Sequence, residues 1–210
     1  MTMISVDIGG GESHEYSSGI TAGEVIQNVH GKKSGAVAAT VDGEERDLSH
    51  ILDSDCKVEP IIGDSEQGLY ILRHSCAHLL AQAVTELFPD AKPTIGPPIE
   101  HGFYYDFHMD PIGEGEMREI EKRMKELVKQ NLPMEREEHG NDSLREMFAS
   151  NPFKLEIMDD KIGGDVGSSA YRQGDFVDLC RGPHVSATSQ MRGFKLTSTS
   201  QDYWRADRGR

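Results

Sequence analysis

Residues 66–88 read EQGLYILRHSCAHLLAQAVTELF, and this stretch predicts a long amphipathic helix. The helix begins at Ser65 or Glu66, and it ends before Pro89 because proline cannot continue a helix. Apolar side chains recur at every third or fourth position, so they form one stripe that we expect to face the core. The stripe consists of Leu69, Leu72, Cys76, Leu80, Ala83 and Leu87.

Two histidines of this stretch, His74 and His78, lie one helical turn apart. At ~100° per residue, both imidazoles point away from the apolar stripe, toward a cleft, a second layer or solvent. We therefore expect that either can be replaced without loss of folding. This spacing suits metal ligation or paired proton transfer, but it is also common on plain helix surfaces.

A second pair with three intervening residues, Cys180 and His184, occurs in DFVDLCRGPH at 175–184. Cys180 ends a predicted strand over 176–180, and a Gly-Pro turn separates it from His184. Histidine and cysteine are the side chains that zinc prefers. The matched spacing of the two pairs indicates a single chemical site.

The first 62 residues predict a small unit with the order β-β-α-β-β. A hairpin is expected from Met3–Ile8 and His14–Tyr16, and Thr21 with an acidic residue three positions later forms a capping box for a short helix. Further strands are predicted over Ala36–Val41 and Cys56–Ile62. This order favours a β-grasp, ubiquitin-like unit over another small α+β domain.

A polar turn after residue 62 divides the chain into two predicted α+β domains, 1–63 and 64–210. In the second domain we expect another amphipathic helix over 113–131 and a strand over 153–158. The glycine-rich stretch 162–174 is expected to be a loop. Two layers, helices against a sheet, follow from this mixture.

The composition excludes several classes of protein. Of 210 residues, 36% are hydrophobic and 28% are charged, as in a soluble globular protein. No apolar run approaches the ~20 residues of a membrane span, and the first residues lack a secretion signal, so we expect a cytoplasmic protein without a membrane partner. The three cysteines (Cys56, Cys76 and Cys180) are few and far apart, so we expect them to be reduced.

The charge is unevenly distributed. The formal net charge of −14 speaks against nonspecific binding to a polyanion. Residues 170–210 nevertheless carry seven basic and four acidic side chains. A nucleic-acid partner should therefore meet the C-terminal segment.

Together these motifs resemble a known family. RHSCAHLLAQAV at 73–84 and DFVDLCRGPH are similar to the second additional domain, the editing domain, of threonyl- and alanyl-tRNA synthetases. IGPPIEHGFYYDF at 95–107 resembles the threonyl form, and the sequence lacks the glycine-rich motif of alanyl editing proteins. A leading TGS-type β-grasp unit and YWRAD at 203–207 match the threonyl enzyme in order and spacing.

The resemblance implies hydrolysis of the ester that joins serine to threonine tRNA. The chain is then an aminoacyl-tRNA deacylase whose partners are tRNA(Thr) and the 3′ end of seryl-tRNA(Thr). We find no ATP-dependent catalytic or anticodon-binding domain, so the chain is either an N-terminal piece of a threonine-tRNA ligase, partnered by its catalytic domain, or a free-standing editing protein. The alternatives are a noncatalytic tRNA- or RNA-binding module and an alanyl-type zinc-dependent trans-editing hydrolase.

The resemblance also implies roles for particular residues. His74 and His78 hold and activate the attacking water, and Lys154, on the predicted 153–158 strand, stabilises the anionic intermediate or positions the water. Cys180 and His184 shape the pocket and contact the terminal ribose, with a covalent Cys180 nucleophile as the less favoured alternative. The implied catalytic set is His74, His78, Lys154, Asp178, Cys180 and His184.

Substrate binding is expected from Tyr104, Tyr105, Asp178 and Arg181. Asp178 shares a strand face with Cys180 and could bind the seryl ammonium. The two tyrosines lie on an alternating strand, so one should enter the pocket and the other the core. The resemblance to the threonyl form implies that no cofactor is required, while zinc, held by the two histidine- and cysteine-containing pairs, stays open.

Overall fold

The computed structural model describes residues 2–161 and 169–201. The N-terminal unit, residues 3–62, contains a five-stranded sheet in the order β2-β1-β7-β4-β5. Strands β1 and β7 run parallel in its interior, and the other neighbouring strands are antiparallel. The bounds are β1 Met3–Asp7, β2 Ser13–Ser17, β4 Ala36–Val41, β5 Glu44–Arg46 and β7 Cys56–Ile62, with a short pair of β3 Ile20–Thr21 and β6 Ile51–Leu52.

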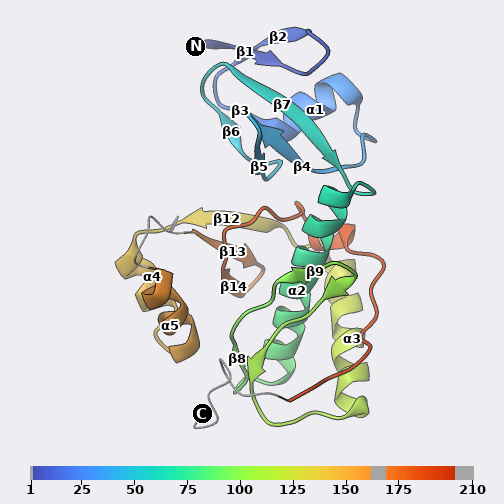
Figure 1. Ribbon diagram of the computed structural model, residues 1–210, viewed down its shortest axis with the longest axis vertical. Helices are drawn as coiled ribbons and strands as arrows, with labels where there is room; N and C mark the ends of the chain where they lie inside the picture. Colours follow the sequence, from blue (N-terminus) through green and yellow to red (C-terminus); the bar gives the residue numbers. More distant parts are fainter. Residues whose placement is uncertain (1, 162–168, 202–210) are drawn as a thin grey trace.

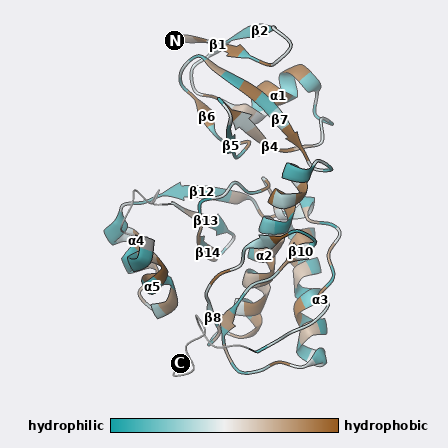
Figure 2. Cartoon of the chain, viewed as in Figure 1, coloured by the Kyte–Doolittle hydropathy of each residue, from teal (hydrophilic) through white to brown (hydrophobic). Residues whose placement is uncertain are grey.

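Helix α1 (Ala22–His30) packs against β4 and β7. The predicted capping box is present: Thr21 Oγ1 accepts the N–H of Glu24, whose carboxylate accepts the N–H of Thr21. Hydrophobic and hydrophilic positions are interleaved along β7 (Figure 2), so its apolar side chains can enter a core. That core contains Ile4, Val6, Ala22, Val25, Ile26, Ala39, Leu52 and Val58.

Helix α2 (Glu66–Leu87) follows β7 almost directly and descends into the rest of the molecule (Figure 1). Ser65 caps it by accepting the N–H of Gly68. The helix packs against α3 (Glu114–Gln130), as two amphipathic helices should. The predicted core stripe is only partly right: Leu69 and Leu87, at its ends, are 39% and 37% exposed. The buried face of α2 instead includes Ile71 and His78, outside the stripe.

The segment after α2 forms two short hairpins. Strand β8 (Lys92–Pro93) pairs with β11 (Phe107–His108), and β9 (Pro98–Ile99) pairs with β10 (Gly102–Phe103). Tyr104 and Tyr105 lie between β10 and β11 rather than on one continuous strand, so the predicted strand is wrong there.

A three-stranded antiparallel sheet lies across from α2 in the order β12-β13-β14. Its strands are β12 Met134–Glu138, β13 Ser169–Gln173 and β14 Phe176–Leu179. Strand β13 replaces part of the loop predicted over 162–174, whose residues 162–168 lie outside the described part. The YWRAD segment at 203–207 also lies outside it.

Helices α4 (Asn141–Met147) and α5 (Pro152–Lys161) lie between β12 and β13 in the chain, and a short 3-10 helix, η1 (Thr188–Gln190), follows β14. The strand predicted over 153–158 is therefore wrong, and Lys154 lies on α5. Asn151 Oδ1 accepts the N–H groups of Phe153 and Lys154, and Pro152 occupies the first helical position. An asparagine cap followed by proline is a helix-start signal that outweighs the β-like composition of this stretch.

Among the described residues, no helix has both the length and the apolar character needed to span a membrane. All three cysteines are free, in agreement with the expectation that they are reduced.

Candidate active site

The candidate site lies between the middle of α2 and the end of β14. Helix α2 supplies His74 and His78, and the chain leaving β14 supplies Cys180 and His184. Gly182 turns the chain between these two with φ of 71°, and a Cβ there would lie 1.9 Å from the hydroxyl of Tyr171. Glycine is therefore required at this turn on two counts.

The two motif pairs meet in one cluster. Ring centroids of His184 lie 4.2 Å from His74 and 4.1 Å from His78. The Sγ of Cys180 lies 3.3 Å from Nε2 of His74 and 3.2 Å from Nε2 of His184, and it also accepts the N–H of Gly182 at 3.3 Å. One candidate ligand atom from each of the four residues lies within 4.8 Å of the others.

Ser75 fixes the orientation of His184. Its Oγ donates to the carbonyl of Ile71 at 2.9 Å and accepts the N–H of Val185 at 3.1 Å. The same oxygen lies 3.1 Å from Nδ1 of His184, which leaves Nε2 to face Cys180. A buried hydroxyl therefore sets which nitrogen of His184 points into the cluster.

A buried ion pair adjoins the histidines. The ammonium of Lys154 pairs with Oδ1 of Asp178, and the two residues are 3% and 2% exposed. Lys154 Nζ donates to the hydroxyl of Tyr105 at 2.9 Å, and that hydroxyl donates to Oδ2 of Asp178. His78 Nε2 lies 3.6 Å from the same carboxylate oxygen. Asp178 is thus surrounded, and a substrate ammonium would reach it only by displacing a partner.

Burial sets the protonation of this region. It lowers the pKa of His74, lowers that of His78 to about 3 and lowers that of His184 well below its usual value, so all three imidazoles are neutral near pH 7. Burial also raises the pKa of the Cys180 thiol to about 12. For Asp178, burial alone would raise the pKa, but Lys154, His78 and Tyr105 together lower it, and the group is a carboxylate.

The structure brings together the six predicted catalytic residues and separates the two tyrosines. Tyr105 is 8% exposed and enters the site, with its ring packed over Gly96, where a Cβ would lie 2.1 Å from the ring. Tyr104 is 41% exposed, so the expectation that the second tyrosine enters the core is wrong, and it lies outside the contacts just described. Arg181 is exposed immediately after Cys180, and its carbonyl accepts Nη1 of Arg136 at 2.6 Å.

Sequence reasoning missed two residues beside the cluster. The ring of Tyr171 on β13 lies edge-on to His184, with centroids 4.5 Å apart, and Tyr171 is 1% exposed. Asp47, from the N-terminal unit, accepts hydrogen bonds from Tyr171 and from the backbone of His184. A β-prone tyrosine within 162–174 was a usable signal for β13, whereas nothing in the sequence near Asp47 resembles a site motif.

A cavity of about 530 Å³ lies between the end of α2, the α4–α5 turn and the β13–β14 sheet. Lys154 lines it together with Asn151, Phe176 and Glu86. The histidines and Cys180 are not among its lining residues. The ion pair thus separates this cavity from the cluster, whose accessible members are the half-buried His74 and Cys180.

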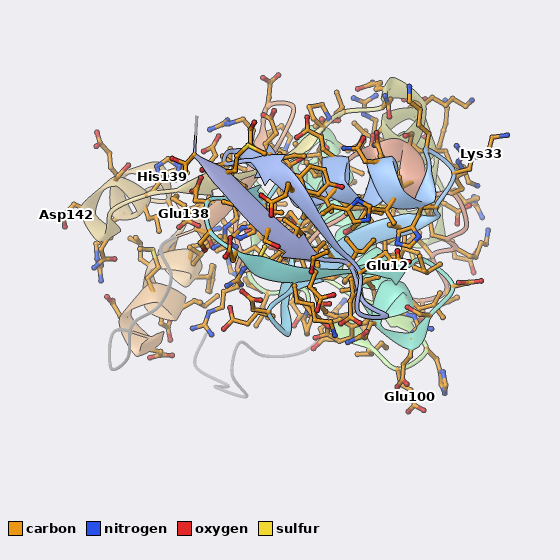
Figure 3. The ribbon with its side chains drawn as sticks, turned by 90° about the horizontal axis from the view of Figure 1, so that it is seen from above. Glu12, Lys33, Glu100, Glu138, His139 and Asp142 are labelled. Atoms are coloured by element: carbon orange, nitrogen blue, oxygen red, sulfur yellow. The ribbon has the colours of Figure 1, made fainter. Side chains whose placement is uncertain are left out.

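The chain as a whole carries more acidic than basic side chains. Glu100 and Asp142 extend outward from the ribbon (Figure 3), as expected for a chain with a net charge of −14. Of the basic side chains predicted to meet a nucleic acid, Arg172 is held by an ion pair with Glu137. Arg181 is exposed beside Cys180.

The donor set fits zinc. Two imidazole nitrogens lie within hydrogen-bond distance of the Cys180 sulfur, and His184 carries an outer partner in Ser75, as metal-bound histidines usually do. If zinc binds, His74, His78, Cys180 and His184 would hold it, and the ion would supply a Lewis acid and a more acidic water.

The chain is similar in sequence to known proteins. Residues 169–204 match the family described as the "Threonyl and Alanyl tRNA synthetase second additional domain". The chain is 50% identical over 161 residues to the threonine--tRNA ligase of Thermoplasma volcanium, covering 77% of this chain and 24% of the relative. It is 42% identical over 207 residues to that of Rubrobacter xylanophilus (98% and 32%) and 44% identical over 211 residues to that of Pelobacter propionicus (99% and 33%).

The chain therefore spans about a quarter to a third of the length of these relatives. Over most of its own length the chain is similar to threonine-tRNA ligases, and its C-terminal part matches the family described as the second additional domain of threonyl and alanyl tRNA synthetases.

Proposed function

We propose that the site hydrolyses the aminoacyl ester of Ser-tRNA(Thr), which makes the chain the editing part of a threonine-tRNA ligase or an editing protein in its own right. The observation that carries the proposal is the convergence of two distant motif pairs with a buried Lys154–Asp178 pair. A binding surface does not need neutral imidazoles and a buried cation in one place, whereas ester hydrolysis needs both.

We further propose that residues 1–63 are a TGS-like β-grasp domain and residues 64–210 the editing domain. The N-terminal unit supports this assignment, since its first and last long strands, β1 and β7, are parallel neighbours in the sheet and one helix packs on it. Strand β2 pairs antiparallel with β1 on one side, and the β4–β5 hairpin pairs antiparallel with β7 on the other, as in a ubiquitin-like sheet.

In the proposed reaction His74 is the proton acceptor. Its imidazole is neutral and half-buried; it hydrogen-bonds the backbone of Pro183, and its Nε2 lies 3.3 Å from the Cys180 sulfur. A water that takes the place of the thiol contact reaches the Nε2 lone pair. His74 takes a proton from this water while the water oxygen bonds to the ester carbonyl carbon. His78 is fully enclosed and instead supports the arrangement of His184 and Asp178.

Lys154 stabilises the negative charge that develops on the carbonyl oxygen. Its ammonium is buried and bonded to Asp178 and Tyr105, so the ester carbonyl must take the place of the Tyr105 hydroxyl to reach it, while Asp178 keeps the ammonium oriented. In this buried position the interaction is stronger than in water. When the carbon–oxygen bond to the ribose breaks, the imidazolium of His74 returns its proton to the leaving ribose oxygen. The products are free serine and tRNA with a free terminal hydroxyl.

Cys180 acts in this proposal as a neutral thiol that links His74 and His184. Its pKa of about 12 keeps it protonated near pH 7, and a thiol is a much poorer nucleophile than a thiolate. The reaction therefore proceeds by direct attack of water, without a covalent enzyme intermediate.

A second candidate is an alanyl-type zinc-dependent deacylase, which the donor set of the cluster favours. Release of labelled serine from Ser-tRNA(Thr) tests both hydrolytic candidates against a noncatalytic RNA-binding module. We expect release well above the spontaneous rate and its loss in a His74→Ala variant. Tight tRNA binding without release would support the binding module.

A further inference from the structure

The geometry points to Asp47, on the N-terminal unit, as a positioning residue for the proposed hydrolytic centre, so that the centre is incomplete without that unit. This inference rests on the proposed function and names a residue outside the editing motifs. Asp47 lies between β5 and β6, far in sequence from every other residue of the site.

Both carboxylate oxygens of Asp47 bond to the site. Oδ1 accepts the backbone N–H of His184 at 2.8 Å, and Oδ2 accepts the hydroxyl of Tyr171 at 2.6 Å. These partners lie 137 and 124 residues further along the chain. One side chain therefore holds two neighbouring elements, β13 and the segment after β14, in a fixed relation.

The two partners of Asp47 control the same imidazole. His184 contacts Cys180 and both α2 histidines, and the Tyr171 ring packs edge-on against it. Loss of Asp47 would free the His184 backbone on one side and the Tyr171 ring on the other. The His184 ring would then change position, and such a change near a reacting group lowers the rate of hydrolysis without removing any catalytic atom.

The N-terminal unit packs against α2 through a shared apolar core. Val37, Ala38 and Ile61 of its sheet belong to the same buried cluster as Ile71 and Cys76 of α2. Asp47 therefore belongs to a unit that is held against α2 by buried apolar contacts.

The test uses the chain with Asp47→Ala and Asp47→Asn, and Asp55→Ala as the matched control. Asparagine keeps an acceptor for the His184 N–H and an amide that can donate to the Tyr171 oxygen. Asp55 also accepts a backbone N–H within the N-terminal unit, that of Ser5 at 2.8 Å, but it contacts no residue of the described cluster. Its replacement therefore reports the effect of merely weakening that unit.

We expect Asp47→Ala to lower kcat for Ser-tRNA(Thr) at least ~10-fold with KM within about twofold, because positioning and not binding is lost. Asp47→Asn should retain kcat within about threefold. An Asp47→Ala kcat within about twofold of the wild type, or an equal loss in Asp55→Ala at the same Tm, would overturn the inference.

Histidine ring NMR of the same variants gives a readout that does not depend on activity. The His184 ring resonances, identified by their loss in a His184 variant, should shift in Asp47→Ala and stay unchanged in Asp55→Ala. If the wild type hydrolyses no ester, the proposed function fails, but the His184 resonances still show whether Asp47 positions His184. Unchanged His184 resonances in Asp47→Ala would refute that positioning role.

Discussion

Lys154 on α5 and Asp178 on β14 form an ion pair that is almost completely enclosed, with exposures of 3% and 2%. A buried pair of this kind gains Coulomb energy at the cost of removing two charges from water. Its net contribution to stability is therefore modest, but the loss of one partner leaves an unpaired buried charge.

The pair predicts strong coupling in a double-mutant cycle. Lys154→Met or Asp178→Asn alone should cost about 3–5 kcal/mol of the free energy of unfolding, and the double variant should recover about 2–3 kcal/mol relative to their sum. Urea unfolding measures the free energy of unfolding of the wild type, the two single variants and the double variant. The exposed Asp175→Asn, from the same hairpin, serves as the control and should stay within about 0.5 kcal/mol of the wild type. Additive losses would contradict a coupled pair.

The two histidines of α2 should behave differently. His78 is 3% exposed and packs against His184 and Tyr171, so His78→Ala should cost about 2–4 kcal/mol of stability. His74 is half-buried, and His74→Ala should cost about 1 kcal/mol. Both should lower kcat about 10²-fold or more.

The burial of His78 corrects the sequence-based expectation that either histidine can be lost without effect on folding. His78 is buried because the β12–β14 sheet covers the histidine side of α2. Thermal unfolding of the two variants, measured beside deacylation, checks the difference. Equal losses of Tm would show that His74 is as enclosed as His78.

Much of this fold follows from local sequence signals. The Thr21–Glu24 capping box, the hairpin of β1 and β2 and the long helix α2 each depend on neighbouring residues, and the structure contains all three. The shared face of His74 and His78 was also predictable, since residues at i and i+4 on a helix lie on one side. Their meeting with Cys180 and His184 was expected from the matched spacing of the two pairs.

One error overlooked a local signal: Lys154 was placed on a strand, although Asn151 and Pro152 begin a helix there. The other errors arise where distant contacts decide. The burial of His78 depends on a sheet that forms much later in the chain. Asp47 reaches the site only through tertiary packing, so no local pattern could reveal it.

Metal removal should leave the reaction intact. The chain itself supplies a neutral imidazole as proton acceptor and the Lys154 ammonium for the oxyanion, so extended chelation should keep deacylation within about twofold. Zinc content by mass spectrometry should be well below one per chain. Stoichiometric zinc, with activity lost on its removal and restored by its return, would establish the zinc-dependent alternative.

Glu121 of α3 should govern part of the acid sensitivity of the fold. It accepts hydrogen bonds from Lys125 Nζ at 2.5 Å and the N–H of Leu196 at 3.1 Å, which together with Lys195 lower its pKa to about 2, the bond from Lys125 contributing most. The unfolded chain binds this proton near pH ~4.3. The stabilisation is therefore fully present above that pH and is lost as the pH falls toward the folded-state pKa.

Glu121→Gln should accordingly flatten the pH dependence of the unfolding free energy between about pH 4.5 and 2, where a single group contributes up to ~1.4 kcal/mol per pH unit. Urea unfolding at several pH values in this window measures it. The exposed Glu119→Gln is the control from the same helix and should leave the slope unchanged. A slope unaffected by Glu121→Gln would contradict this assignment.

The central claim is selective hydrolysis of the wrong ester. Serine and threonine differ by one methyl group, and a site that accepts threonine can reject serine by only ~1–3 kcal/mol, so a second site that excludes the larger residue is needed. Such a site excludes threonine by crowding around the β-carbon of the amino acid, where the extra methyl group of threonine clashes or displaces the attacking water.

The most direct measurement compares the single-turnover deacylation rates of Ser-tRNA(Thr) and Thr-tRNA(Thr) by the purified chain. The seryl ester should be cleaved at least ~10²-fold faster, mainly in the chemical step, because the tRNA contacts are common to both substrates. Similar rates for the two esters, or no cleavage above the spontaneous rate while tRNA still binds, would contradict an editing function.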